Sequence, residues 1–269
     1  MNSHPSSRPA TVARALTPAS SLSLTAALGE QFTALYALVQ RSGHVFGSTL
    51  GPLFEQGRSH PLPRFVYFGP ETSDASVRLA FLAGFDHRDL RGTLSLLHFV
   101  EGLALKPDVG QRLNLTVFPI VDLLGLAGFA RDTRLAQENW TRTEVPELRL
   151  LEQDARANGY HGYVRLETTT EDIVVAQLRS SPHVEHPTPA VEFVTSEDFE
   201  PFAVRWESEV GEATAGPLSV AADLSFQPFE LTLRLPTAWT PELHREAAAS
   251  ILKKFITRYR AFIAYGQHL

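Results

Sequence analysis

Two apolar segments with a helical segment between them constrain what this chain can fold into. Residues 77–83 and 113–121 are short apolar runs, and residues 90–103 between them place leucines at helical spacing. A connection of this length, through a helix, favours parallel strands rather than a hairpin. The pattern therefore predicts an α/β architecture.

The remaining segments extend this architecture. Helices are predicted at 22–41, 146–157 and 240–266, the last two with proline at the start, and further strands at 161–169, 190–194, 203–206 and 229–235. Residues 65–69 and 77–83, separated by a polar turn at 70–74, predict a hairpin at one side of the sheet. We expect a flexible tail over residues 1–21. Residues 22–269 then form a single domain with a mixed, twisted sheet of about eight strands and helices on both faces.

Composition excludes several classes of function. The chain has 269 residues, 43% of them hydrophobic, and a formal net charge of −6, so it lacks the basic field that nucleic-acid binding requires. It has no cysteine, which excludes disulfides, thiolate zinc sites and a cysteine nucleophile. No stretch approaches the roughly 20 apolar residues that span a bilayer, and the N-terminus lacks the apolar core of a signal peptide. We expect a cytoplasmic protein without nucleic-acid or membrane partners; no feature specifies its oligomeric state.

Polar residues occur where several of the apolar strands end. The run 81–83 continues into Gly84-Phe85-Asp86-His87-Arg88-Asp89, and the strand at 161–169 carries Glu167 near its end. Residues 113–129 contain a strand followed by a turn, and residues 229–236 end in Leu-Thr-Leu-Arg-Leu-Pro, with Arg234. In an α/β sheet, loops at the carboxyl ends of the strands form the ligand crevice.

In this order, the segments resemble the zinc carboxypeptidase superfamily over residues 45 to 265. The family motif Gly-x-His-x-x-Glu has Asp86 in its His position and Asp89 in its Glu position. Glu167 stands where the family ends a strand on a third zinc ligand, a His. Arg234 replaces the general base, the Glu of Leu-Thr-x-Glu-Leu-Pro. The resemblance implies the carboxypeptidase fold, and it implies that these four residues converge in one crevice, within about 10 Å of one another.

The substitutions change which metal such a site suits. Asp86, Asp89 and Glu167 offer only oxygen, which suits Mg²⁺, Ca²⁺ or Mn²⁺ better than Zn²⁺. His87 would supply a zinc ligand if the loop shifted by one residue. The expectation is that no metal is bound, with one of these divalent cations as the alternative. Without a cation the acids are either solvated or paired with Arg88, Arg91 or Arg165, because unpaired carboxylates repel one another.

Replacement of the general base has a separate consequence. A guanidinium is protonated at physiological pH and has no acceptor, so Arg234 cannot take a proton from water. Either it neutralises the acids at positions 86, 89 and 167 as a substitute for the cation, or it points to solvent from a strand whose other face is core.

Ligand-binding candidates lie between residues 131 and 140. Arg131 and Arg134 suit recognition of a carboxylate, because guanidinium groups bind it through two hydrogen bonds. The resemblance places Asn139 among residues that hold a substrate carboxylate, and Trp140 where the family has Arg. A tryptophan there would stack on a ring or cap an apolar pocket. His183 and His186, although three apart, are interpreted as part of a proline-rich loop.

Three functions follow from this reading. The leading one is a non-peptidase relative of the zinc carboxypeptidases that binds a small anionic or peptide-like ligand in the former active-site crevice. The alternative is an active metal-dependent hydrolase with a carboxylate-rich site, either a carboxypeptidase or an N-acyl amino acid amidohydrolase similar to the succinylglutamate desuccinylase–aspartoacylase branch. A third is an inert crevice, with protein contacts made by an outer surface.

Overall fold

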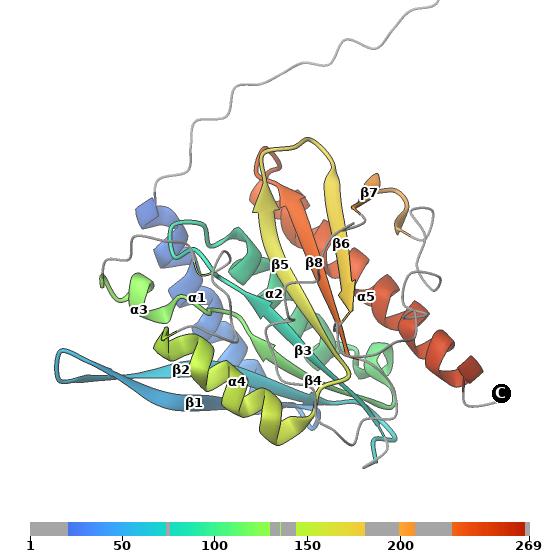
Figure 1. The fold of residues 1–269 in the computed structure, drawn as a ribbon, viewed down its shortest axis with the longest axis horizontal. Coiled ribbons are helices and arrows are strands. Elements are labelled where there is room, and N and C mark those ends of the chain that lie inside the picture. Colours follow the sequence, from blue (N-terminus) through green and yellow to red (C-terminus); the bar gives the residue numbers. More distant parts are fainter. Residues whose placement is uncertain are drawn as a thin grey trace, which may run out of the picture.

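Eight strands form one mixed sheet in the order β1-β2-β4-β3-β5-β8-β6-β7 (Figure 1). The structure is a computed structural model that describes residues 21–73, 76–129, 135, 144–180, 199–207 and 228–266. The strands are β1 (Val45–Glu55), β2 (Arg58–Phe68), β3 (Val77–Ala83), β4 (Leu113–Phe118), β5 (Gly162–Thr169), β6 (Val174–Ser180), β7 (Val204–Glu207) and β8 (Phe229–Pro236). The helices are α1 (Ser21–Val39), α2 (Arg91–Leu105), α3 (Leu123–Leu126), α4 (Pro146–Asn158) and α5 (Pro241–Gly266), with a 3₁₀ turn η1 (Pro107–Gly110). The predicted fold class is confirmed.

The four central strands β4, β3, β5 and β8 run parallel to one another. Strands β2 and β6 flank them in the antiparallel direction, and β1 and β7 form the edges. The connection from β3 through α2 to β4 is the parallel crossover that the apolar pattern predicted. Because the central strands are parallel, their carboxyl ends all lie at the same end of the sheet.

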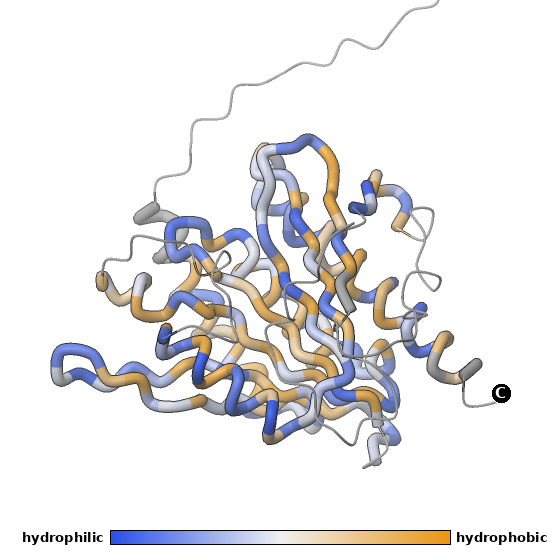
Figure 2. The backbone as a smooth tube through the Cα atoms, viewed as in Figure 1, coloured by the Kyte–Doolittle hydropathy of each residue, from blue (hydrophilic) through white to orange (hydrophobic). Residues whose placement is uncertain are grey.

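Helices cover both faces of the sheet. Helices α1, α2 and α5 pack on one face, where Phe81 of β3 stacks on Phe99 of α2 with ring centroids 5.5 Å apart. Helix α4 packs on the other face, where its Leu148 and Leu151 join Leu82 of β3 in a second buried cluster. Figure 2 shows mostly hydrophilic residues along α4 and mostly hydrophobic residues along β3. Alternate side chains of β3 therefore pack into two apolar layers, one on each face of the sheet.

Local signals set the helix ends. Pro146 occupies the first turn of α4, and Gly159 closes the helix in the left-handed conformation, at φ 56°. Helix α5 starts with Pro241, and the Thr240 hydroxyl accepts a hydrogen bond from the backbone N–H of Leu243. Helices α5 and α1 are the longest described, with 26 and 19 residues, as predicted.

The hairpin predicted from residues 65–69 and 77–83 is wrong. Strand β2 pairs with β1 and β4, and β4 lies between β2 and β3. The physical reason is burial: β3 is almost entirely buried and takes an interior position, whereas β2 has exposed residues and lies nearer the edge. The real hairpin joins β1 and β2 through Gln56 and Gly57, both at positive φ, as a two-residue turn requires.

Two other predictions concern segments outside the described residues, and two strands of the sheet were not predicted. The strand predicted at 190–194 and nearly all of the tail predicted at 1–21 lie outside them. Strands β1 and β6 were not anticipated, although β6 contains the apolar run that begins at Val174. Within the part of the chain that the structure describes, no helix is both long enough and apolar enough to cross a membrane.

A tight backbone contact supports the corner between β2 and β4. A Cβ atom at Gly69 would lie 1.7 Å from the carbonyl oxygen of Gly110, and backbone cannot move away as a side-chain tip can. Gly69→Ala should therefore lower the free energy of unfolding by about 3 kcal/mol, measured by urea denaturation. Gly29→Ala is the control: nothing lies within 4 Å of that position in α1, and alanine favours helix, so stability should stay or rise. Equal effects of the two changes would contradict this packing.

Two buried histidines predict a pH dependence of stability. Burial lowers the pKa of both His161 and His244 to about 4, whereas an exposed histidine titrates near 6.5. Between these values the unfolded chain binds more protons, so stability falls as pH falls. The free energy of unfolding should drop by about 1 to 2 kcal/mol per histidine from pH 7 to pH 5. His244→Asn should reduce this slope and His98→Asn, at a half-exposed side chain, should not; a slope unchanged by His244→Asn would contradict the assignment.

Candidate functional site

The turn after β3 is built for close approach. Gly84 has φ 68°, and a Cβ atom there would lie 2.7 Å from the Thr93 hydroxyl and 3.0 Å from the Cα atom of Ile120. The Gly84 carbonyl accepts a hydrogen bond from the backbone N–H of Asp122, which lies beyond the end of β4. The ends of β3 and β4 are thereby held together, and the chain turns into the segment that carries Asp86 and Asp89.

Asp86 and Asp89 each hold the local backbone and a neighbouring arginine. The Asp86 carboxylate accepts hydrogen bonds from the backbone N–H of Arg88 at 3.1 Å and from its guanidinium at 2.8 Å. The Asp89 carboxylate pairs with Arg91 at 3.2 Å and accepts the Thr168 hydroxyl at 2.8 Å. These are the arginine pairings that the sequence offered as an alternative to a metal. They stabilise the turn before α2 and join it to β5.

A buried ion-pair network crosses β5 and β8. Arg165, with a side chain only 7% exposed, donates to Glu230 at 2.9 Å and to Glu167 at 2.6 Å. Its guanidinium carbon also lies 4.5 Å from the centre of the Phe85 ring, a cation–π contact. Burial by itself would lower the pKa of Arg165, but the two carboxylates outweigh it and raise the pKa. Arg165 therefore stays charged inside the sheet, with its charge compensated.

Arg234 extends this network toward β6 and β7. Its Nε lies 3.7 Å from the second carboxylate oxygen of Glu167, and its Nη atoms bind Glu207 at 3.2 Å and Gln177 at 3.0 Å. Its side chain is 30% exposed, so Arg234 neither points freely to solvent nor lies fully inside. Glu167 thus sits between two guanidinium groups. Sequence reasoning named Arg165 as a partner but missed Glu230 and Gln177, because strand partners cannot be read from spacing.

A pocket of about 200 Å³ opens at the carboxyl ends of β3 and β5. Asp86, Asp89 and Glu167 all line it, together with threonines of β5 and the following turn. Arg234 is outside the lining and contacts the pocket through Glu167. The structure thus brings the three predicted acids together. The proposed ligand residues Arg131, Arg134, Asn139 and Trp140, and also His183 and His186, lie outside the described residues.

The donors at this pocket do not fit zinc. No imidazole lines it, and each of its three carboxylates is bound to at least one guanidinium group. Across the described ranges, no group of three or more His, Asp or Glu side chains is arranged to hold a metal ion. Zinc sites favour imidazole or thiolate ligands, and oxygen-only sets favour harder cations.

One imidazole lies nearby and is oriented by a carboxylate. His87 Nδ1 is 2.6 Å from the Asp122 carboxylate, which also accepts the backbone N–H groups of His87 and Gly125. There is little room at this contact, since a Cβ atom on Gly125 would lie 2.4 Å from His87 Nδ1. Asp122 also caps the short helix α3. The pair fixes the loop next to Asp86, and His87 is not among the residues that line the pocket.

Comparisons with known proteins agree with this fold. No family model matches the sequence, and no curated protein matches it. Among solved structures, a metallo-carboxypeptidase from Burkholderia cenocepacia superposes with a TM-score of 0.67 at 16% identity, covering 87% of this chain and 69% of that one. A metallo-carboxypeptidase from Pseudomonas aeruginosa, in complex with (2-guanidinoethylmercapto)succinic acid, gives 0.58 at 15% identity, covering 85% and 68%.

A third similar structure is bovine thrombin-activatable fibrinolysis inhibitor in complex with tick carboxypeptidase inhibitor. It has a TM-score of 0.61 at 12% identity, covering 88% of this chain and 97% of that one. Identities this low show the fold alone. The chain therefore has the metallo-carboxypeptidase fold, which the motif resemblance implied.

The buried pair Arg165–Glu230 and the partly exposed pair Arg234–Glu207 should contribute differently to the free energy of unfolding. Glu230→Gln leaves Arg165 in the sheet with less compensation and should lower the free energy of unfolding by about 3 kcal/mol, because unpaired buried charge is costly. Glu207→Gln is the matched control: its side chain is 36% exposed, and the loss should stay below about 1 kcal/mol. Chemical denaturation at pH 7 measures both. A smaller loss at position 230 than at 207 would show that the network is not held by burial.

Proposed function

We propose that this protein is a non-peptidase relative of the zinc carboxypeptidases, in which an ion-pair network takes the place of the metal centre. The former crevice then binds a small anionic or peptide-like ligand. The observation that carries the proposal is the position of Glu167, whose two carboxylate oxygens face Arg165 at 2.6 Å and Arg234 at 3.7 Å. Guanidinium groups supply the positive charge that a cation would otherwise supply.

The chemistry of these groups argues against hydrolysis. Hydrolysis of an amide by water requires a base to take the proton of the attacking water. Arg234 cannot do so, because a guanidinium has no acceptor, and the carboxylate of Glu167 is already engaged by the guanidinium groups of Arg165 and Arg234. The same arrangement suits binding, because a paired network holds its shape without a metal.

The lining of the pocket indicates what kind of ligand it takes. Carboxylates of Asp86, Asp89 and Glu167, with hydroxyls of Thr168 and Thr237, favour a ligand that donates hydrogen bonds, such as the amide or ammonium group of a peptide-like molecule. A volume of about 200 Å³ is below the range of about 300–1,000 Å³ typical of ligand pockets, which limits the ligand to a small group. An anionic group would instead be bound by Arg131 and Arg134.

The alternative is a metal-dependent hydrolase, and one observation favours it. Asp86, Asp89 and Glu167 line one pocket, and all-oxygen ligands of this kind suit Mg²⁺, Ca²⁺ or Mn²⁺. Such a cation would have to compete with the guanidinium groups that now bind these acids. Carboxypeptidase and N-acyl amino acid amidohydrolase reactions belong to this alternative, and metal analysis separates it from the proposal.

Protein purified without chelator should contain less than about one zinc ion per ten chains, since the donors lack the imidazoles that zinc favours. Carboxypeptidase and N-acyl amino acid hydrolase assays should give rates equal to buffer. Elemental analysis that also quantifies magnesium, calcium and manganese is the measurement. A stoichiometric divalent metal that is lost in Asp86→Ala or Glu167→Ala would overturn the proposal and favour the hydrolase.

A set of reversion variants tests the correspondence of positions. Arg234→Glu alone should restore no activity, because the metal ligands would still be missing. Asp86→His, Asp89→Glu, Glu167→His and Arg234→Glu together should restore zinc binding, which needs about three correctly placed ligands. A quadruple variant that folds, by circular dichroism, yet binds no zinc would show that these positions do not correspond to the family's ligands.

A further inference from the structure

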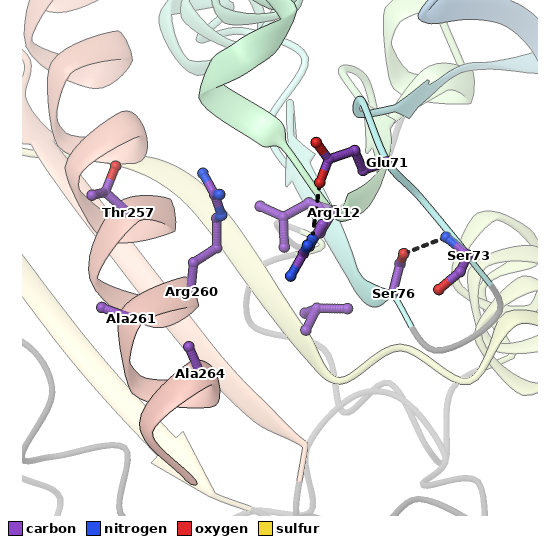
Figure 3. Close-up of a pocket in the computed structure, with 10 residues that line it drawn as sticks. Glu71, Ser73, Ser76, Arg112, Thr257, Arg260, Ala261 and Ala264 are labelled. Atoms are coloured by element: carbon purple, nitrogen blue, oxygen red, sulfur yellow. Dashed lines mark hydrogen bonds and ion pairs between the residues drawn. The ribbon is translucent and has the colours of Figure 1, made fainter. Parts of the chain in front are cut away.

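A larger cavity lies at the other end of the sheet, at the amino ends of the parallel strands β3 and β4. It has a volume of about 680 Å³ and is lined at the first residues of β3 and β4, Val77 and Leu113, together with the last turns of α5 (Figure 3). The acids of the candidate functional site follow the carboxyl end of β3 or lie in β5, so the two pockets open at opposite ends of the parallel strands. Its volume lies within the range of about 300–1,000 Å³ typical of small-molecule sites.

The charged groups that line this cavity are two guanidinium groups and one carboxylate. Arg260 reaches toward it from α5 and Arg112 from the facing loop, where Arg112 Nε binds Glu71 at 3.2 Å (Figure 3). Within the described part of the chain, Arg260 donates long hydrogen bonds of 3.4 Å to the Val109 carbonyl and the Gln111 side chain. Among the described residues no carboxylate pairs with Arg260. Its positive charge therefore remains available to a ligand.

The backbone at Arg112 and Glu71 is held in an uncommon conformation. Both have positive φ, 60° and 58°, which residues other than glycine rarely adopt. The Arg112 N–H donates to the Pro70 carbonyl at 2.8 Å, which fixes the two turns against each other. Backbone strain of this kind concentrates at binding sites, where it places a side chain. Because Glu71 and Arg112 are both more than half exposed, their ion pair is weak and an incoming anion can replace it.

The other lining groups complete a site with two kinds of surface. Thr257 of α5 and Ser76 before β3 provide hydroxyls, while Ala261 and Ala264 provide a small apolar wall. Guanidinium groups bind carboxylate and phosphate alike through paired N–H donors. We propose that this cavity is a second ligand site, which takes a small organic anion with a carboxylate or phosphate group beside an apolar part.

Calorimetric titration of the full chain with phenyl phosphate, phenylacetate and the neutral benzyl alcohol tests this site. At least one of the two anions should bind at one per chain, and benzyl alcohol should not; which anion binds identifies the acidic group. Arg260→Gln and Arg112→Gln should each weaken binding by about tenfold or more, since a charge-assisted hydrogen bond is lost. Arg258→Gln is the matched control, because Arg258 is exposed on the same helix and does not line the cavity.

Further variants keep the result decisive. Ala261→Trp fills the apolar wall without changing charge and should also abolish binding, which covers the case in which Arg260→Gln fails to fold. Arg234→Gln should leave anion binding to this cavity unchanged, because Arg234 contacts Glu167 in the pocket at the carboxyl ends of the strands. The proposal is overturned if neither anion binds, if Arg258→Gln and Arg260→Gln weaken binding equally, or if binding is lost only in Arg234→Gln.

Discussion

Burial of the central parallel strands on both faces is the constraint on which the rest of this structure depends. Strands β3 and β8 are almost entirely buried, and β5 is buried over its first five residues. Their backbone groups must therefore be satisfied by neighbouring strands and their side chains by two apolar layers. Helices α2 and α5 pack on one face and α4 on the other. Polar side chains can therefore be accommodated mainly at the strand ends, where both pockets lie.

The charges that do enter the sheet are paired because of this burial. Arg165 lies in β5 with its side chain 7% exposed, and its partner Glu230 in β8 is 3% exposed. A charge at such depth is tolerated only when its partners compensate for lost hydration. Glu167 and Arg234 then link this buried pair to the partly exposed Glu207. A centre organised by a metal in other proteins of this fold is thus, in our proposal, organised by side-chain ion pairs here.

The turn after β3 depends on close approach of backbone segments. Gly84 and Gly92 permit close approach of backbone segments, with a Cβ atom on Gly92 falling 2.9 Å from the Leu166 carbonyl. Asp86 and Asp89 use their carboxylates to hold this turn and its arginines. The close approaches require glycine for steric reasons, whereas the side chains between the two glycines determine the chemistry of the turn.

Local residue patterns were sufficient to predict the four longer helices, α1, α2, α4 and α5, but not the short helix α3 or the hairpin turn at Gln56 and Gly57. The spacing of apolar residues and the Pro146 and Gly159 signals located α4, and the motif after Gly84 located Asp86 and Asp89, two of the three acids that line one pocket. The order of β2, β4 and β3, and the pairing of Arg165 with Glu230, were settled in three dimensions. Helix formation and turns depend on residues within a few positions of one another, but strand pairing joins segments that are far apart in sequence. Neighbours across β5 and β8 are 65 residues apart at that ion pair, so no local spacing encodes them.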